Sequence, residues 1–442
     1  MTVLDRARKL AVPSARAARE KDRTAARALA LVESEIAGRP RITGAEFGGS
    51  YPKGTWLPGR SDIDIFVRFD VSAPRGEFED VSKEVGFAAL KGHGPYTRFS
   101  EHPYVEAEME GTRINVIPCY EVEKGKWKSA ADRSRFHTAF MKENLTSTMR
   151  DEVRLLKLFL KNNGVYGAEI SRQGFSGYAT EVLVWNFGGF EGVVRGMAGI
   201  RRGQVIGTAG KEFDTPVSIM DPVDPLRNLA AAVSVESLGR LVLLCRGFEK
   251  KQSASYFVRR KLRTSEALLR NCITVSFRHE ERSPDTIWGQ VKRAASAVGQ
   301  QLMMAGFTVA RSGAWTDGRS RACLFFLLES RSIPEYTVRE GPDFFGGDDA
   351  ERFAASGRKA LAVWVGGSGR VMSMERRAES DAQGFLRTLL GRGLDGSGVP
   401  RGIKPDVKRG FAVAAGGSRL PESVKAELLE LVSTDAAVFP SR

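Results

Sequence analysis

The chain has 442 residues, of which 67 are Lys or Arg and 53 are Asp or Glu, giving a formal net charge of +14. This length allows two to four domains. The positive charge favours a polyanionic partner, with nucleic acid as the first candidate and a solvated basic surface as the alternative. The longest apolar runs are too short to cross a bilayer and the N-terminus lacks an apolar signal core, so we expect a cytoplasmic protein outside any membrane.

Four cysteines and four histidines leave little material for a transition-metal site. Cys119, Cys245, Cys272 and Cys323 lie far apart and form no Cys-x-x-Cys pair and no zinc spacing. We therefore expect reduced, partly buried thiols. No G-x-x-x-x-G-K-[ST] sequence occurs, which disfavours a P-loop enzyme.

The patterns along the chain predict an α+β protein. Residues 1–37 predict one or two helices interrupted near Pro13, and residues 40–120 show strand patterns separated by Gly and Pro. Residues 145–255 are predicted to be mostly helical, and residues 256–442 alternate strand-like and helical patterns. The clearest expected elements are strands over Arg60–Phe69, Tyr104–Glu110 and Thr112–Ile117 and helices over Asp151–Lys161 and Val235–Phe248.

Residues 48–69 contain a Gly-Ser turn followed, about a dozen residues later, by two aspartates in an apolar run. Asp62 and Asp64 occupy alternate positions of the expected strand and so share one face. Neighbouring carboxylates repel each other unless a cation lies between them, and hard oxygen ligands favour Mg²⁺ over Zn²⁺. The Gly49-Ser50 turn can offer N–H groups and a hydroxyl to a phosphate. A lone Asp-x-Asp also occurs by chance, so this pattern alone is a weak indication of a metal site.

The motifs around the aspartates are more specific together than singly. With Lys53-Gly54-Thr55, the segment resembles the signature of the DNA polymerase beta-like nucleotidyltransferases. Further segments follow in order: Glu101–Val105, Asn115–Tyr120, Asp132–His137, Glu152–Lys157, Gly164–Glu169, Gly174–Tyr178 and Asp221–Asn228. In this order and spacing, the set resembles the archaeal-type (class I) CCA-adding enzymes, which are tRNA nucleotidyltransferases.

This resemblance implies a domain organisation and a reaction. It implies a nucleotidyltransferase catalytic head at residues 1–142 with a mixed sheet and helices, a helical central domain at 143–255, and an α+β C-terminal tRNA-binding region at 256–442. The 3′-OH of a tRNA would attack the α-phosphate of CTP or ATP and release pyrophosphate, so that C, C and A are added without a nucleic-acid template. Two Mg²⁺ ions would be the cofactors. The tRNA would be held by its acceptor arm and elbow, and a homodimer is one assembly that we consider.

The resemblance also implies roles for individual residues. Asp62 and Asp64 match the first two metal-binding carboxylates. The positions that match nucleotide contacts are Ser50, Lys53, His137, Lys157, Tyr166 and Arg227. The family commonly has Arg where this chain has Lys53, so the charge is kept and the bidentate fork is lost. The alternatives are structural roles: a solvated lysine for Lys157, a packed aromatic for Tyr166, a surface histidine for His137 and a salt bridge with Asp224 for Arg227.

Asn115 stands at the catalytic position where the family places a third aspartate. An amide offers one oxygen to a metal but no charge, and its uncompensated presence would cost roughly 10²-fold or more in rate. A hairpin turn near Gly111 would set a glutamate across from Asn115: Glu106 if the loop begins at Glu110, or Glu108 if it begins at Gly111. We hypothesise that one of these glutamates supplies the missing charge. The alternative is that both are ordinary strand residues.

Three functions therefore remain open at this point. The first is an active CCA-adding enzyme, and the second is a tRNA-binding protein silenced by a natural or introduced Asn115. The third is a nucleotidyltransferase that acts on another acceptor, which Gly174–Tyr178 and the Arg227 region disfavour because they resemble the tRNA enzymes. Dense basic residues between positions 240 and 311, including Arg259-Arg260-Lys261, predict contacts with RNA phosphates.

Overall fold

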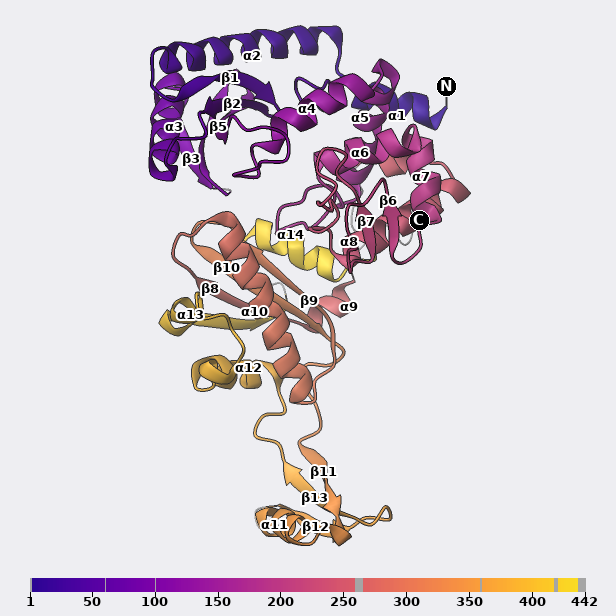
Figure 1. Cartoon of the computed structure of the whole chain (residues 1–442). Coiled ribbons are helices and arrows are strands. Elements are labelled where there is room, and N and C mark those ends of the chain that lie inside the picture. Colours follow the sequence, from indigo (N-terminus) through magenta and orange to yellow (C-terminus); the bar gives the residue numbers. More distant parts are fainter. Residues whose placement is uncertain are drawn as a thin grey trace. The chain divides into compact units, whose positions relative to one another are not determined.

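The computed structural model describes residues 2–59, 61–99, 101–258, 265–357, 360–416 and 420–435. The chain divides into two compact units, residues 1–261 with 435–442 and residues 262–434, whose elements can be followed by colour in Figure 1. Within the described ranges, no helix is long and apolar enough to cross a membrane. The four cysteines are free and buried, as expected.

Two helices precede the first sheet. α1 (Val3–Ala11) ends before Pro13, and α2 (Ala15–Ile36) begins after Ser14, whose hydroxyl accepts a hydrogen bond from the amide of Ala17 at 3.2 Å. A serine cap satisfies an amide that has no partner inside the helix, so the chain can restart a helix directly after the break. The predicted interruption near Pro13 is confirmed.

Five strands form the first sheet in the order β1-β2-β5-β4-β3. Their bounds are β1 Ile42–Gly48, β2 Ile63–Phe69, β3 Tyr96–Phe99, β4 Pro103–Met109 and β5 Thr112–Tyr120. β2 and β5 are parallel and the other pairs are antiparallel, which confirms the predicted mixed sheet. α2 and α3 (Arg75–Ala89) share a hydrophobic core with Ile63, Ile65 and Val67 of β2. The alternate residues of β2, including Asp64, therefore lie on the opposite face.

The hairpin between β4 and β5 fixes the strand register. Met109 pairs with Thr112, and the two loop residues, Glu110 and Gly111, have φ values of 51° and 72°. Positive φ at both loop positions is typical of the turn that suits the twist of a two-residue hairpin. Of the two predicted registers, the one that begins at Glu110 is confirmed and the other is wrong.

Helices surround the core of the central region. Their bounds are α4 Arg133–Asn144, α5 Ser147–Asn162, α6 Gly177–Phe187, α7 Phe190–Ala198, α8 Val235–Lys250 and the short 3₁₀ helix Ala254–Phe257. In α5 the apolar residues Val153, Leu156 and Phe159 recur at helical spacing and are fully buried. Two three-residue strands, β6 (Gln204–Ile206) and β7 (Val217–Ile219), pair in parallel. The prediction of a mostly helical region missed them because three residues are too few for a period-two pattern.

The second unit is α+β, as predicted. A four-stranded antiparallel sheet has the order β14-β8-β10-β9, and a three-stranded sheet has the order β11-β13-β12. The strands are β8 Cys272–Arg278, β9 Val309–Thr316, β10 Arg321–Leu328, β11 Tyr336–Asp343, β12 Ala362–Val365, β13 Arg370–Arg376 and β14 Phe411–Ala415. The helices are α9 Glu266–Arg270, α10 Pro284–Met304, α11 Asp348–Ser356, α12 Ala382–Gly391, α13 Lys404–Arg409 and α14 Glu422–Leu431, with 3₁₀ turns at Phe344–Gly346 and Leu394–Gly396.

Candidate active site

Asp62 and Asp64 lie side by side at the start of β2, on the face opposite α2 and α3. Burial raises the pKa of both carboxyl groups, and the charge of Asp62 raises the pKa of Asp64 further. Gly49 comes within contact of this pair: its φ is +66°, and a Cβ atom there would collide with Oδ2 of Asp64. Glycine is therefore required in the turn, since only glycine combines this backbone conformation with so close an approach.

Asn115 is the neighbour of Asp64 on β5. Its Nδ2 donates a hydrogen bond to Oδ1 of Asp64 at 2.8 Å, while its own Oδ1 is buried and has no protein partner. In the described part of the chain, no three acidic, His or Cys side chains are close enough to hold a metal ion. Two repelling carboxylates and one orphaned amide oxygen nevertheless form a set of hard oxygen donors that suits a divalent cation such as Mg²⁺.

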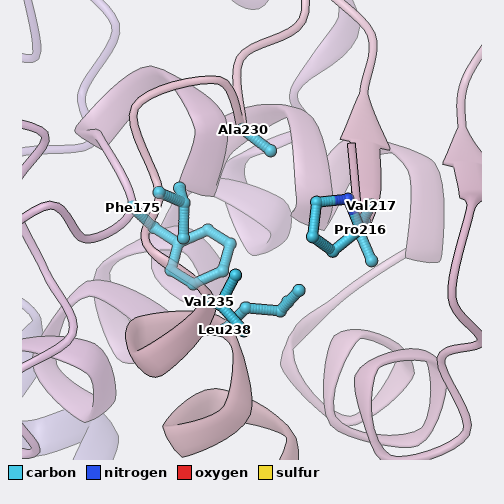
Figure 2. A pocket seen from close by; sticks show the side chains of 7 residues that line it. Phe175, Pro216, Val217, Ala230, Val235 and Leu238 are labelled. Carbon is cyan, nitrogen blue, oxygen red and sulfur yellow. The ribbon is translucent and has the colours of Figure 1, made fainter. Parts of the chain in front are cut away.

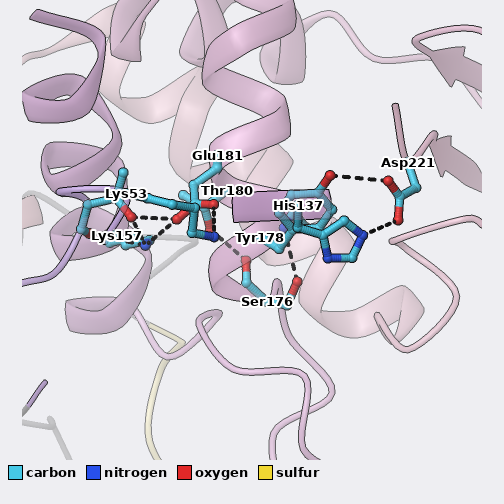
Figure 3. Close-up of polar contacts among 10 residues, drawn as sticks. Lys53, His137, Lys157, Ser176, Tyr178, Thr180, Glu181 and Asp221 are labelled. Atoms are coloured by element: carbon cyan, nitrogen blue, oxygen red, sulfur yellow. Dashed lines mark hydrogen bonds and ion pairs between the residues drawn. The ribbon is translucent and has the colours of Figure 1, made fainter. Parts of the chain in front are cut away.

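Lys53 and Lys157 meet at one buried carboxylate, that of Glu181 in α6 (Figure 3). Lys53 forms an ion pair with Glu181, and Nζ of Lys157 lies 3.1 Å from Oε1 of Glu181. The hydroxyl of Thr55 donates to the same carboxylate, and its carbonyl oxygen accepts from Lys157 at 3.1 Å. The three charged side chains are at most 6% exposed. Two lysines and one carboxylate leave one excess positive charge, which favours an anion nearby.

The two lysines control the ionisation of Glu181, and burial controls theirs. Despite its burial, the pKa of Glu181 is lowered to about 2 by the charges of Lys53 and Lys157 and by the hydrogen bonds that it accepts. Burial lowers the pKa of both lysines, against the opposing charge of Glu181. The solvated position considered for Lys157 is therefore wrong, because its ammonium is enclosed by protein.

Tyr166 and Ser50 lie close to this cluster without belonging to it. A Cβ atom on Gly177, the first residue of α6, would lie 3.0 Å from the hydroxyl of Tyr166 and 3.6 Å from Nζ of Lys157. This glycine therefore lets the phenol and the ammonium approach the start of the helix. Ser50 is half-buried in the turn before Lys53, where its carbonyl oxygen accepts from the amide of Thr55 at 3.1 Å.

A second carboxylate, that of Asp221, gathers His137, Arg227 and Tyr178. Nε2 of His137 lies 2.9 Å from Oδ2 of Asp221, Arg227 donates to the same oxygen at 3.1 Å, and Tyr178 donates to Oδ1 at 3.1 Å. The rings of His137 and Tyr178 stack with their centroids 3.8 Å apart, and Figure 3 shows the contacts of these two side chains with Asp221. Hydrogen bonds and the nearby charges lower the pKa of Asp221 to about 2 against its burial, and burial lowers the pKa of His137.

The structural roles considered as alternatives for Arg227 and His137 are both wrong. Arg227 pairs with Asp221, whereas Asp224 pairs with Arg133 at 2.9 Å, so the predicted alternative salt bridge is wrong. His137 is 12% exposed at its side chain and is not a surface histidine. Nζ of Lys53 lies 5.3 Å from the ring centroid of Tyr178, which connects the Glu181 and Asp221 clusters.

Two cavities among the described residues of this unit are lined by residues other than the predicted nucleotide contacts. One is apolar, has a volume of about 20 Å³ and is lined by Phe175, Pro216, Val217, Ala230, Val233, Val235 and Leu238 (Figure 2). This volume holds about one water molecule, so it does not fit a nucleotide. The other, of about 220 Å³, lies between α2 and the residues that precede Asp62, with Lys21, Trp56 and Ser61 in its lining.

Comparisons with known proteins assign the family. Residues 33–137 match the nucleotidyltransferase domain family, residues 151–258 the second domain of tRNA nucleotidyltransferases, and residues 257–416 the C-terminal domain of CCA-adding enzymes. A CCA-adding enzyme of Pyrobaculum islandicum is 36% identical over 400 residues, which cover 88% of this chain and 94% of the relative. The chain belongs to the CCA-adding enzyme family.

Two further likenesses accompany this assignment. A CCA-adding enzyme of Methanothermobacter thermautotrophicus is 33% identical over 408 residues, covering 89% of this chain and 88% of the relative. Among solved structures, the Cid1 poly(U) polymerase is similar with a TM-score of 0.44 and 13% identity, over 58% of this chain and 97% of that chain. The predicted resemblance to the CCA-adding enzymes is confirmed by these relatives, and the predicted nucleotidyltransferase head is confirmed by the match of residues 33–137 to the nucleotidyltransferase domain family.

The sequence does not identify two acidic residues that hold the predicted nucleotide contacts in place. Glu181 and Asp221 each hold two of the predicted nucleotide contacts. Glu181 is 128 residues from Lys53 and Asp221 is 84 residues from His137, although Arg227 is only six residues from Asp221. Glu181 carried a usable sequence signal, because it is the one acidic residue in the otherwise uncharged segment Gly177–Phe187. Asp221 carried none beyond its place in a motif.

The structure describes only part of the basic stretch between positions 240 and 311 that is predicted to bind RNA. The cluster Arg259–Lys261 lies outside the described residues. Arg240 pairs with Asp435 at 2.6 Å and Arg246 donates to the carbonyl oxygen of Ala198 at 2.8 Å. These two arginines have internal partners, so the basic stretch is not uniformly available to RNA phosphates.

Proposed function

We propose that this chain adds C, C and A to the 3′ end of tRNA from CTP and ATP, without a nucleic-acid template. Its membership of the CCA-adding enzyme family supports this function over transfer to another acceptor. The structural observation that carries the proposal is that one compact unit holds a pair of carboxylates at one place and a pair of ammonium groups at another. Carboxylates that suit a cation stand at Asp62 and Asp64, and excess positive charge stands at Lys53 and Lys157.

In this proposal the charges divide the work on the nucleotide. Asp62, Asp64 and the amide oxygen of Asn115 would hold Mg²⁺, and we expect two ions. When bound, such ions lower the pKa of the attacking 3′-OH and stabilise charge on the leaving pyrophosphate. Ser50, Lys53, Lys157 and Tyr166 would bind the triphosphate, since an ammonium group and hydroxyls complement phosphate oxygens.

The Asp221 cluster would hold the base end of the nucleotide. Arg227 is 41% exposed at its side chain, so it can donate to a ligand while Asp221 fixes its direction. The stacked rings of His137 and Tyr178 give this part of the site a rigid aromatic wall. We place the reaction in the cytoplasm with tRNA bound by its acceptor arm and elbow, and light scattering of the purified chain would test the homodimer.

The test is incubation of the chain with tRNA lacking its CCA end, labelled CTP or ATP, and Mg²⁺, beside the Asn115→Asp variant. Incorporation by both proteins is the expected result. Incorporation by the Asp variant alone would identify a tRNA-binding protein silenced by Asn115. No incorporation by either protein, with tRNA still bound, would contradict the proposal and point to another acceptor.

A further inference from the structure

A row of five directly paired residues crosses the first sheet. Gly48 pairs with Asp64, Asp64 with Asn115, Asn115 with Glu106 and Glu106 with Tyr96. Directly paired residues project to one face of a sheet. Asp64, Asn115 and Glu106 thus occupy adjacent positions on the face opposite α2 and α3. Glu106 lies in β4, directly beside Asn115 of β5, the residue that stands in place of the third carboxylate.

Glu106 is buried in a polar environment. It is 3% exposed, and Tyr96 donates a hydrogen bond to Oε1. Nε of Arg98 lies 3.5 Å from Oε2, and Nε of Arg113 lies 3.7 Å from Oε1. A carboxylate this deeply buried keeps its charge only when cations or donors compensate it. The arginines supply that compensation here.

Arg113 connects Glu106 to the aspartate pair. Its Nε lies 3.5 Å from Oδ1 of Asp62 as well as 3.7 Å from Oε1 of Glu106, so the two oxygens are no more than about 7 Å apart, the sum of these distances. The Arg113 side chain is 44% exposed. It can therefore turn toward solvent, whereas Glu106 is held in β4 and Asp62 directly precedes β2.

The side-chain oxygen of Asn115 is an independent indication that a cation binds here. It is 6% exposed, its Nδ2 is used by Asp64, and its Oδ1 has no partner. A buried carbonyl oxygen without a donor is costly. A cation beside Asp64 would satisfy this oxygen.

We propose that Glu106 supplies the negative charge that Asn115 lacks, as a counter-charge of the divalent cation at Asp62, and that Arg113 occupies this place until the cation enters. The inference rests on the proposed function, because it deepens the same metal site. The notion that Glu108 could serve equally is wrong, since Glu108 is exposed and pairs with Arg113 on the neighbouring row.

The test is a titration of Mn²⁺, followed by electron paramagnetic resonance of the free ion, in the presence of the non-reactive α,β-methylene analogue of CTP. The proteins are the natural chain, Glu106→Gln, Asn115→Asp, the double variant of these two and the matched control Glu108→Gln. We expect two ions per natural chain. In Glu106→Gln the affinity for one ion should fall by at least about 10-fold, and Glu108→Gln should bind as the natural chain does.

The double variant separates a metal role from a structural one. If Glu106 supplies charge to the cation, an aspartate at position 115 replaces it, and the double variant should bind both ions nearly as tightly as Asn115→Asp alone. Unchanged affinity in Glu106→Gln would overturn the inference. An equal loss from Glu106→Gln in the natural chain and in the Asn115→Asp variant would overturn it as well.

Failure of the inference and failure of the proposed function are distinguishable. If the natural chain incorporates CMP into tRNA while Glu106→Gln binds both ions as tightly, the function stands and the inference falls. If the Mn²⁺ results are as expected but neither the natural chain nor Asn115→Asp incorporates CMP, the metal role of Glu106 stands and the function falls.

Discussion

The aspartate end and the lysine end of the candidate site are built in opposite ways. At the aspartate end, burial raises the pKa values of Asp62 and Asp64, the charge of Glu106 adds to the rise for Asp62 and the charge of Asp62 adds to the rise for Asp64, so the negative charges of the two aspartates destabilise the folded chain. At the lysine end, the pKa of Glu181 is lowered to about 2, so its negative charge stabilises the folded chain. The first end is arranged to receive a cation and the second is arranged to hold its own cations in place.

This difference separates activity from stability. Residues that await a ligand are commonly strained or repelled without it, and their replacement stabilises the protein while it abolishes function. Replacing a residue that positions other side chains instead destabilises the protein, because its loss leaves buried charges without partners. The substitutions below test whether the two ends behave in this way.

The largest effect on activity is expected for Asp64→Asn. The variant should lose about 10³-fold or more in CMP incorporation, because a carboxylate that complements charge in the reaction is removed. Its free energy of unfolding at pH 7 should rise by about 1 kcal/mol, since the repulsion from Asp62 is relieved while an amide oxygen still accepts from Asn115. Chemical denaturation and a labelled-nucleotide assay measure the two quantities, and reduced stability would contradict the repulsion.

The largest effect on stability is expected for Glu181→Gln. This change leaves Lys53 and Lys157 buried without a counter-charge and should lower the free energy of unfolding by about 3–5 kcal/mol. The matched control is Glu191→Gln, an exposed glutamate in the neighbouring α7. Equal denaturation midpoints for the two variants would show that Glu181 does not hold the lysines.

Acid should remove the same stabilisation in the natural chain. The folded pKa of Glu181 is about 2, below its ordinary value of 4.5. The contribution of Glu181 is therefore fully present above about pH 4.5 and is lost as the pH falls toward 2, by an amount on the order of 3 kcal/mol. Between pH 7 and pH 3 the free energy of unfolding should fall less steeply with pH in Glu181→Gln than in the natural chain. Parallel pH dependences of the two proteins would show that the pKa of Glu181 is not lowered in the folded chain.

A smaller effect is expected for Asp221→Asn. The variant keeps one acceptor oxygen but loses the charge that fixes Arg227 and His137. Losing a charged hydrogen bond costs about 1.5–3 kcal/mol, so KM for CTP and ATP should rise roughly tenfold or more, with a smaller change in kcat. Steady-state kinetics with both nucleotides measure this split, and a fall in kcat alone would place Asp221 outside nucleotide binding.

The sequence predicts the local features of this site and misses its long-range partners. The helical spacing of Val153, Leu156 and Phe159 identified α5, and the apolar run around Asp62 and Asp64 identified β2, because each signal lies within a few residues. The hairpin register needed the backbone, since both loop positions were compatible with the residues near Gly111.

The pairing of charges was beyond local patterns. Glu181 lies 128 residues from Lys53, and Asp221 lies 84 residues from His137. Only the packing of α5 and α6 against the turn after Ser50 brings the first pair together. The choice between Asp224 and Asp221 as the partner of Arg227 is a different case, because both aspartates lie within six residues of Arg227 and only the loop conformation decides between them.

The measurement that tests the central claim most directly is the sequence of the product. The natural chain is incubated with tRNA lacking its CCA end, CTP, ATP and Mg²⁺, and the 3′ ends are read by sequencing, with Asp64→Asn as the inactive control. We predict that the natural chain completes the ends with C, C and A, in that order, and that the control leaves them unchanged. Ends that stay unextended with the natural chain, or that gain a different sequence, would contradict the account.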